Sequence, residues 1–168
     1  MMADHATITY CPVCGYRGWK ISGRSERRHK LWFGLVKLLW EAHQNPQEKW
    51  EDIERLRYWL TVKAGHYEEK LLLKQFELNA MPHLPSLIEA VLQGEERKRM
   101  FAVMRTNGTL SVRRAKSIAW HKMREEEFIE LVNRGMDIVV SMVPEMPRSH
   151  ALSALKEITG LNALEWLE

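Results

Sequence analysis

The sequence predicts an α+β protein with two long antiparallel helices, a β-hairpin in a small sheet, further helices late in the chain and a short N-terminal hairpin carrying a CPVCG turn. Three observations support this class. Apolar residues recur every three or four positions over 31–42, a helix start occurs at Pro46, and Asn107-Gly108 separates two β-like runs. We expect the hairpin over 1–23 and one domain over 24–168.

The two long helices are expected to follow each other directly. The first spans about Ser25 to His43, and its apolar stripe consists of Leu31, Leu35, Leu38, Leu39 and Ala42. The segment Asn45-Pro46-Gln47-Glu48 combines an N-cap residue, a proline at the first helical position and an acid in the first turn. The second helix is therefore predicted from Pro46 to about Ala64, and the short link between the two predicts antiparallel packing.

The strand signal is strongest near residue 107. FAVMR and TLSVRR flank Asn107-Gly108, a pair that suits a two-residue type I′ turn. KSIAW at 116–120 is a candidate third strand, whereas LLLKQF at 71–76 is compatible with either strand or helix. Apolar spacing predicts later helices over 86–99, 123–143 and 149–158.

The N-terminal hairpin carries two cysteines, Cys11 and Cys14, on the tight turn CPVCG. Two thiolates at this spacing are typical of half a tetrahedral zinc site. No second CxxC occurs, so the remaining ligands would have to come from histidines or from a second subunit. The turn is therefore either part of a Zn²⁺ site or purely structural. If it binds zinc, a zinc-dependent enzyme is a further alternative.

Two segments are basic. The first, which we call the basic collar (24–30), stands at the start of the first helix, where the helix dipole disfavours cations. The second, the hairpin region (97–116), surrounds the predicted hairpin. Aromatic residues interleave with both, as in surfaces that track phosphates and stack bases. The candidate nucleic-acid-binding residues are Arg24, Arg27, Arg28, His29, Lys30, Trp32, Arg105, Arg113, Arg114, Lys116 and Trp120.

Several function classes lack their signatures. The sequence contains no phosphate-binding glycine loop, no GxSxG motif and no HExxH motif, and no apolar run long enough to cross a bilayer. The formal net charge of +3 is modest, so nucleic-acid binding would depend on clustered charge. We therefore expect a non-enzymatic, cytoplasmic binding protein.

Three patches, RRHKLW, YWLTVKAGHYEE and KSIAWHKMREEEFIEL, occur in this order within about 25–143. In this respect the chain resembles small tailed-phage proteins of unknown function related to the NinB (lambda Orf) recombination proteins. The CPVCG turn and residues 68–99, which look like an insertion, depart from that pattern. The matching residues are Arg27, Arg28, His29, Lys30, Trp32, Trp59, Gly65, His66, Tyr67, Lys116, Ser117 and Trp120.

The resemblance implies an α+β homodimer in the host cytoplasm that binds single-stranded DNA and contacts the host single-strand-binding protein. Such a protein helps to load a recombinase without enzymatic turnover. The alternative is a phage interaction protein that inhibits a host nuclease or defence complex, with basic residues that cover or imitate a nucleic-acid-facing surface.

Overall fold

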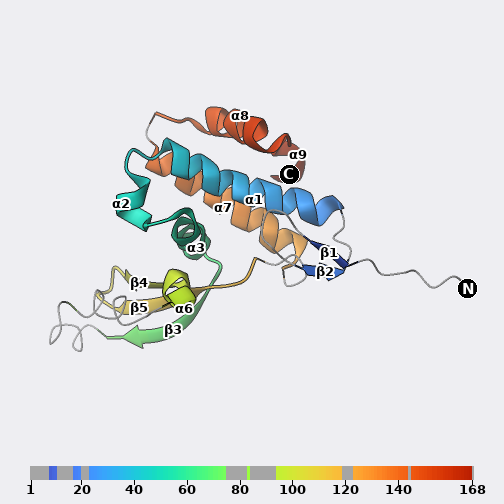
Figure 1. The fold of residues 1–168 in the computed structure, drawn as a ribbon. Helices are drawn as coiled ribbons and strands as arrows, with labels where there is room; N and C mark the ends of the chain where they lie inside the picture. The colour runs from blue at the N-terminus through green and yellow to red at the C-terminus, as the bar shows by residue number, and fades with distance from the viewer. Residues whose placement is uncertain are drawn as a thin grey trace, which may run out of the picture.

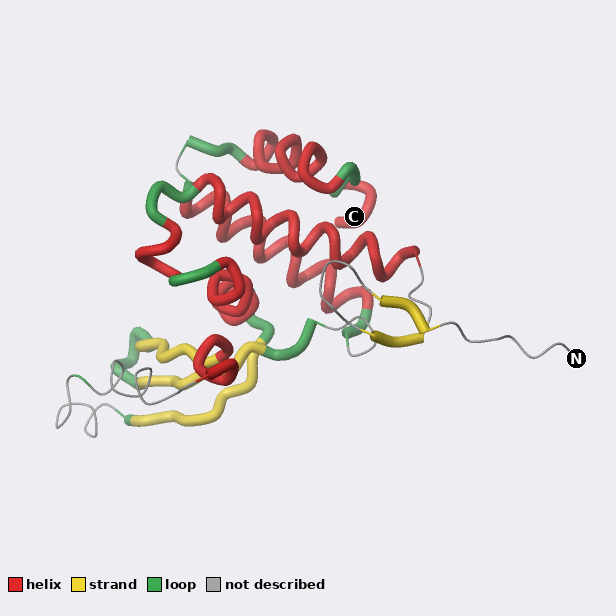
Figure 2. The backbone as a smooth tube through the Cα atoms, in the orientation of Figure 1, coloured by secondary structure: helices red, strands yellow, loops and turns green. Residues whose placement is uncertain are grey.

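The chain folds into a helical layer and a small antiparallel sheet, with one helix between them. The computed structural model describes residues 8–10, 17–19, 23–74, 83, 94–118, 123–143 and 145–167. The colours of Figure 2 separate the two parts, with the long helices on one side and strands β3, β4 and β5 on the other. This arrangement confirms the α+β class.

The helical layer consists of α1 (Gly23–Ala42), α7 (Glu125–Met142) and α8 (Arg148–Thr159). Figure 1 shows α1 and α7 lying together and running in the same direction, with α8 packed alongside them. The predicted spans of these helices are therefore confirmed to within two residues at each end. A short helix, α9 (Leu164–Leu167), ends the described chain.

The core lies between α1 and α7. It is built from the apolar stripes of both helices, including Leu31, Leu35, Leu39, Leu131, Val132, Met136 and Val139. Trp32 is fully buried and lies against Gly135, where an added Cβ would be 2.9 Å from the tryptophan Cζ3. The helices can approach this closely because residue 135 has no side chain.

The predicted second helix is interrupted. It forms as α2 (Pro46–Trp50) and α3 (Ile53–Lys63), because Glu51 takes a positive φ of 66° and Asp52 then caps the new helix by accepting from the backbone N–H of Arg55 at 2.7 Å. In Figure 1, α3 is seen end-on while α1 lies in the plane of the view. The predicted antiparallel pair is therefore wrong, because the chain turns at Glu51 and α3 crosses α1.

The sheet contains β3 (Tyr67–Leu73), β4 (Met100–Met104) and β5 (Leu110–Ala115), in the order β3-β5-β4, with every pairing antiparallel. The ambiguous 71–76 segment thus begins inside a strand. The candidate third strand at 116–120 is not formed over its described residues, 116–118. Helix α6 (Gly94–Arg99), the described end of the helix predicted over 86–99, leads directly into β4.

The β4–β5 hairpin is confirmed, although its turn differs from the predicted one. Arg105 N–H donates to Thr109 O at 2.8 Å, which leaves a three-residue loop over 106–108. Gly108 has a φ of 74°, but Asn107 does not take the positive φ that a type I′ turn requires. The loop is instead a tight turn closed by a left-handed glycine.

Helix α3 connects the two parts of the molecule. It contacts α1, α7 and β5, and Val62 at its end forms a small apolar cluster with Phe101 and Ala115 of the sheet. Two short strands, β1 (Ile8–Tyr10) and β2 (Arg17–Trp19), pair antiparallel near the N-terminus. The CPVCG turn between them lies outside the described residues.

Candidate nucleic-acid interface

Two cations of the basic collar, Arg28 and Lys30, pair with carboxylates of the same chain. The side chain of Arg28 is only 13% exposed; it pairs with Glu125 at 2.5 Å and lies over the ring of Phe128. Glu125 belongs to the first turn of α7, where a carboxylate also interacts favourably with the helix dipole. The anion that the collar was expected to attract from outside is thus a side chain of this chain.

The other collar residues divide between the core and the surface. His29 is 5% exposed, and burial is the main cause that lowers its pKa, although a hydrogen bond to the backbone of Ile118 acts in the opposite direction. Lys30 pairs with Glu26 at 3.0 Å and Arg27 is exposed, whereas the side chain of Arg24 lies outside the described part. The fully buried Trp32 offers no face on which a base could stack.

The hairpin region is also largely paired. Arg105 bonds to Glu69, and Arg114 donates two hydrogen bonds to Glu96 at 2.9 and 2.8 Å. Arg113 lies on the opposite face of the sheet from Arg114. It donates to Ser111 Oγ at 3.0 Å and lies 4.3 Å from the Tyr67 ring centroid. Lys116 is exposed, and Trp120 lies outside the described residues.

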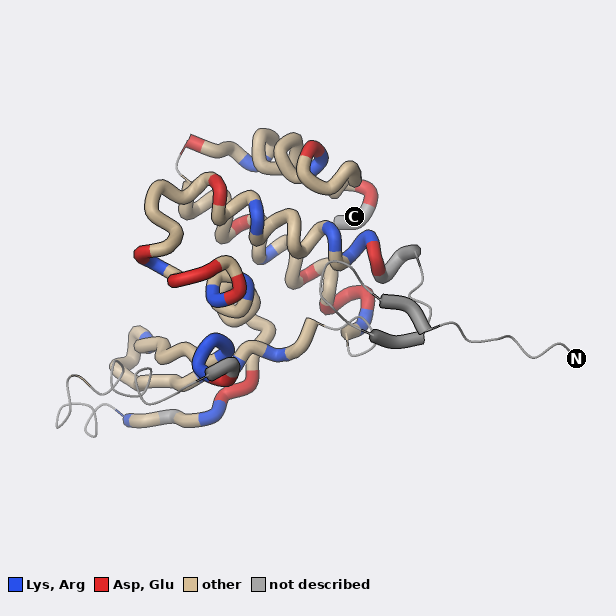
Figure 3. The backbone as a smooth tube through the Cα atoms, viewed as in Figure 1, with Lys and Arg blue, Asp and Glu red and all other residues tan. Residues whose placement is uncertain are grey.

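The two predicted regions do not form one surface. In Figure 1 the start of α1 and the β4–β5 hairpin stand at opposite ends of the described structure. Figure 3 shows basic and acidic positions interspersed along the backbone of the described part. Clustering of charge along the sequence therefore does not produce clustering in space.

A different surface combines basic and aromatic side chains. A groove of about 400 Å³ lies between α2 and α3 on one side and the edge strand β4 on the other. This volume is within the usual range of clefts that hold a small molecule or one unit of a polymer. We call it the α3–β4 groove; its walls include Lys49, Arg55, Trp59, Lys63, Phe101 and Met104.

The cations of the α3–β4 groove lie over aromatic rings. Lys49 Nζ is 5.1 Å from the Trp50 ring centroid, Lys63 Nζ is 5.8 Å from that of Trp59, and the Arg55 guanidinium is 4.1 Å from that of Phe101. Within the described ranges, neither lysine forms an ion pair with a carboxylate. Because a ring screens a cation less than a carboxylate does, these two lysines keep their charge available to an anion.

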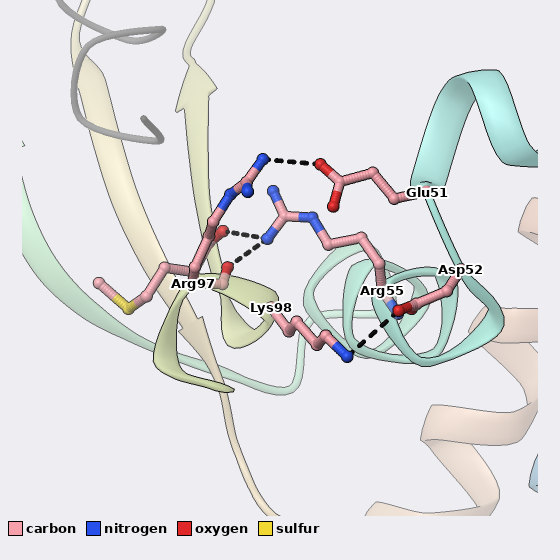
Figure 4. Close-up of polar contacts among 6 residues, drawn as sticks. Glu51, Asp52, Arg55, Arg97 and Lys98 are labelled. Carbon is pink, nitrogen blue, oxygen red and sulfur yellow. Dashed lines mark hydrogen bonds and ion pairs between the residues drawn. The ribbon is translucent and has the colours of Figure 1, made fainter. Parts of the chain in front are cut away.

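A set of polar contacts, which we call the clasp, fixes one end of the groove (Figure 4). Arg55 donates to the backbone carbonyls of Arg97 and Met100, the latter at 3.0 Å. Arg97 pairs with Glu51 at 2.7 Å, and Lys98 pairs with Asp52 at 3.2 Å. The clasp thus joins the α2–α3 turn to the α6–β4 junction at one end of the groove.

Sequence reasoning missed this groove because its walls come from segments about 40 residues apart. Lys63 follows Trp59 by four positions, so both lie on one face of a helix, and Lys49 adjoins Trp50. This helical spacing of a tryptophan and a lysine was a signal in the sequence. What the sequence does not show is that β4 faces the same side chains.

No helix of the described residues is long and apolar enough to cross a membrane. In the same ranges, no group of three or more His, Cys, Asp or Glu side chains could hold a metal ion; Cys11 and Cys14 lie outside them. No protein-family model, curated protein or solved structure matches the chain.

Proposed function

We propose that the protein binds single-stranded DNA in the α3–β4 groove, as a non-enzymatic accessory protein of phage recombination. The observation that carries this proposal is that Lys49 and Lys63 in the groove lie over aromatic rings, whereas Arg28, Lys30, Arg105 and Arg114 pair with carboxylates. Single-strand binders combine a cationic track for phosphates with aromatic rings on which unpaired bases stack.

The geometry of the groove favours unpaired bases. Trp59 is partly exposed in the groove wall, and two ammonium groups lie near its ring centroid: Lys63 Nζ at 5.8 Å and Lys49 Nζ at 6.0 Å. A base stacked on this ring would place its phosphates near both ammonium groups. In a duplex the base faces are already stacked on each other, so we expect the groove to prefer single strands.

Arg105 and Arg113 extend this surface along the sheet. Arg113 is directly opposite Phe101 in the β4–β5 register, so the two side chains share a face; alternation places Arg105 on that face as well. We therefore retain Arg113 as a candidate contact. Arg105 lies on the same face but pairs with Glu69, and Trp32 and His29 support the fold.

The expected partners follow from the resemblance to the NinB-related proteins. We propose that the protein acts in the host cytoplasm, forms a homodimer and contacts the host single-strand-binding protein. The DNA-binding part of the proposal can be tested on the isolated protein.

Fluorescence anisotropy with a labelled single-stranded oligonucleotide tests the proposal. The variant Lys49→Glu/Lys63→Glu should bind at least about tenfold more weakly at low salt, because two phosphate contacts become repulsive. Together with the candidate contact Arg113, the two lysines give three phosphate contacts. The logarithm of the binding constant should then fall with the logarithm of salt concentration with a slope of about −2. The matched control is Lys37→Glu/Lys156→Glu, which changes the net charge equally at exposed positions outside this groove.

Equal loss of affinity in the two double variants would contradict a specific groove and indicate general charge attraction. If the wild-type protein showed no binding at low salt, the proposal would be overturned in favour of the alternative, a phage protein that inhibits a host nuclease or defence complex.

A further inference from the structure

The turn between α2 and α3 is strained at Glu51. This residue has a φ of 66° and a ψ of −57°, and the N–H of Asp52 donates to the carbonyl of Trp50 at 2.7 Å. These values describe a γ-turn of the rare form with positive φ, which is costly for any residue other than glycine. The surrounding contacts hold the backbone in this conformation and direct the Glu51 side chain towards α6.

The carboxylate of Glu51 meets a cation next to the groove. It pairs with Arg97 at 2.7 Å, and both side chains are well exposed, at 59% and 47%. Arg55, which lines the groove and lies over Phe101, donates to the backbone carbonyl of the same Arg97 (Figure 4). Arg97 therefore stands at the clasp end of the α3–β4 groove, with its guanidinium held by one acidic side chain.

We propose that Arg97 is an additional phosphate contact of the groove and that Glu51 occupies it as an internal competitor in the free protein. This inference rests on the proposed function, because it concerns the affinity of the same groove. On binding, a DNA phosphate takes the place of the Glu51 carboxylate on the Arg97 guanidinium, and the Glu51 side chain rotates into the solvent.

The exchange is energetically feasible because the pair is exposed. Ion pairs between exposed side chains contribute little to stability, since both partners are well hydrated when apart. A DNA phosphodiester offers an arginine the same bidentate geometry and the same single negative charge as a carboxylate, so it can take the place of Glu51. Glu51 therefore weakens binding without blocking it, and its removal raises the affinity.

The test compares Glu51→Gln with Asp137→Asn by anisotropy on the same single-stranded oligonucleotide. Asp137 also pairs with an arginine of another element, Arg148, and its replacement changes the net charge equally. Asp137 belongs to α7 and Arg148 to α8, and both of these helices lie away from the sheet in Figure 1. We expect Glu51→Gln to tighten binding about two- to fivefold, the range set by exposed ion pairs, and Asp137→Asn to leave it nearly unchanged.

A third variant assigns the effect to Arg97. In the Arg97→Ala background, Glu51→Gln should give no gain, because the cation for which Glu51 competes is gone. Equal affinities of Glu51→Gln and Asp137→Asn would overturn the competition, and a gain that persists without Arg97 would overturn the assignment to that residue.

The same measurements separate this inference from the proposed function. Wild-type binding that the Lys49/Lys63 variant weakens supports the groove, whatever the Glu51 variants show. No binding by either the wild type or Glu51→Gln would overturn both.

Discussion

The basic collar of α1 and the α3–β4 groove are both rich in cations, but their cations have different neighbours. In the collar, Arg28 is mostly buried and pairs with Glu125, a residue 97 positions later in the chain. In the groove, Lys49 and Lys63 are exposed and lie over tryptophan rings. Under the proposed function, exposed cations that lie over aromatic rings indicate an anion site better than a dense run of charge does.

The position of each region in the fold explains the difference. The collar lies where the N-terminal ends of α1 and α7 meet, so its charged groups are partly removed from water and need internal partners. The groove lies between a helix and an edge strand, where lysine side chains reach solvent. The collar is therefore expected to support the fold and the groove to bind the ligand. Three substitutions test that division, two of them in the collar and one at Trp32, which follows it.

The largest effect is expected for Trp32→Ala. Trp32 is fully buried against Gly135, so its truncation should lower the free energy of unfolding by about 3–5 kcal/mol. Urea or guanidinium titration followed by circular dichroism measures the loss. The fraction that remains folded should bind the oligonucleotide with wild-type affinity, since this ring does not reach the groove. A small stability loss combined with weaker binding would contradict the division.

Local sequence signals predicted much of the helical layer. The apolar spacing of Leu31, Leu35 and Leu39 placed α1, and the apolar spacing over 123–143 placed α7. The Asn107-Gly108 pair located the hairpin, although the loop has three residues. In each case the information lies within a few residues of the feature that it specifies.

The remaining features depend on contacts between distant segments. No glycine or proline marks the break at Glu51; the Arg97 and Lys98 contacts that hold the turn lie more than 40 residues away. The burial of Trp32 depends on the missing side chain of Gly135, and the groove exists only because β4 lies beside α3. The periodicity of a single segment contains no information about these pairings.

The second prediction concerns the Arg28–Glu125 pair. Because the arginine is 13% exposed and the glutamate 39%, Arg28→Ala should destabilise the protein by about 1–2 kcal/mol, between the values typical of exposed and of buried pairs. Lys30→Ala is the control; its pair with Glu26 is exposed and should contribute less than about 0.5 kcal/mol. A double-mutant cycle with Glu125→Ala measures the coupling energy. If Arg28→Ala weakened DNA binding as strongly as the groove variant, the collar would be part of the interface.

The smallest effect is expected from the titration of His29. Burial lowers the pKa of its imidazole in the folded protein, with a further contribution in the same direction from the nearby Arg57. The unfolded chain then binds the proton more readily, so the stability due to neutral His29 is fully present above the unfolded pKa of about 6.5 and is lost as the pH falls through the folded pKa. Carboxylates with lowered pKa values, such as Glu127 with its hydrogen bond from the Arg124 backbone, respond only at more acidic pH.

Thermal unfolding of the wild type and of His29→Gln, measured at pH values above and below the unfolded pKa of about 6.5, tests this effect. The melting temperature of the wild type should fall more steeply on acidification than that of the variant, whereas the pH dependence of oligonucleotide affinity should be the same in both. A histidine that contacted phosphate would behave differently, because its protonation would strengthen binding and the variant would lose that gain. If affinity increased at low pH in a way that depends on His29, the collar would be part of the DNA-binding surface. That result would contradict the assignment of DNA binding to the groove and of a structural role to the collar.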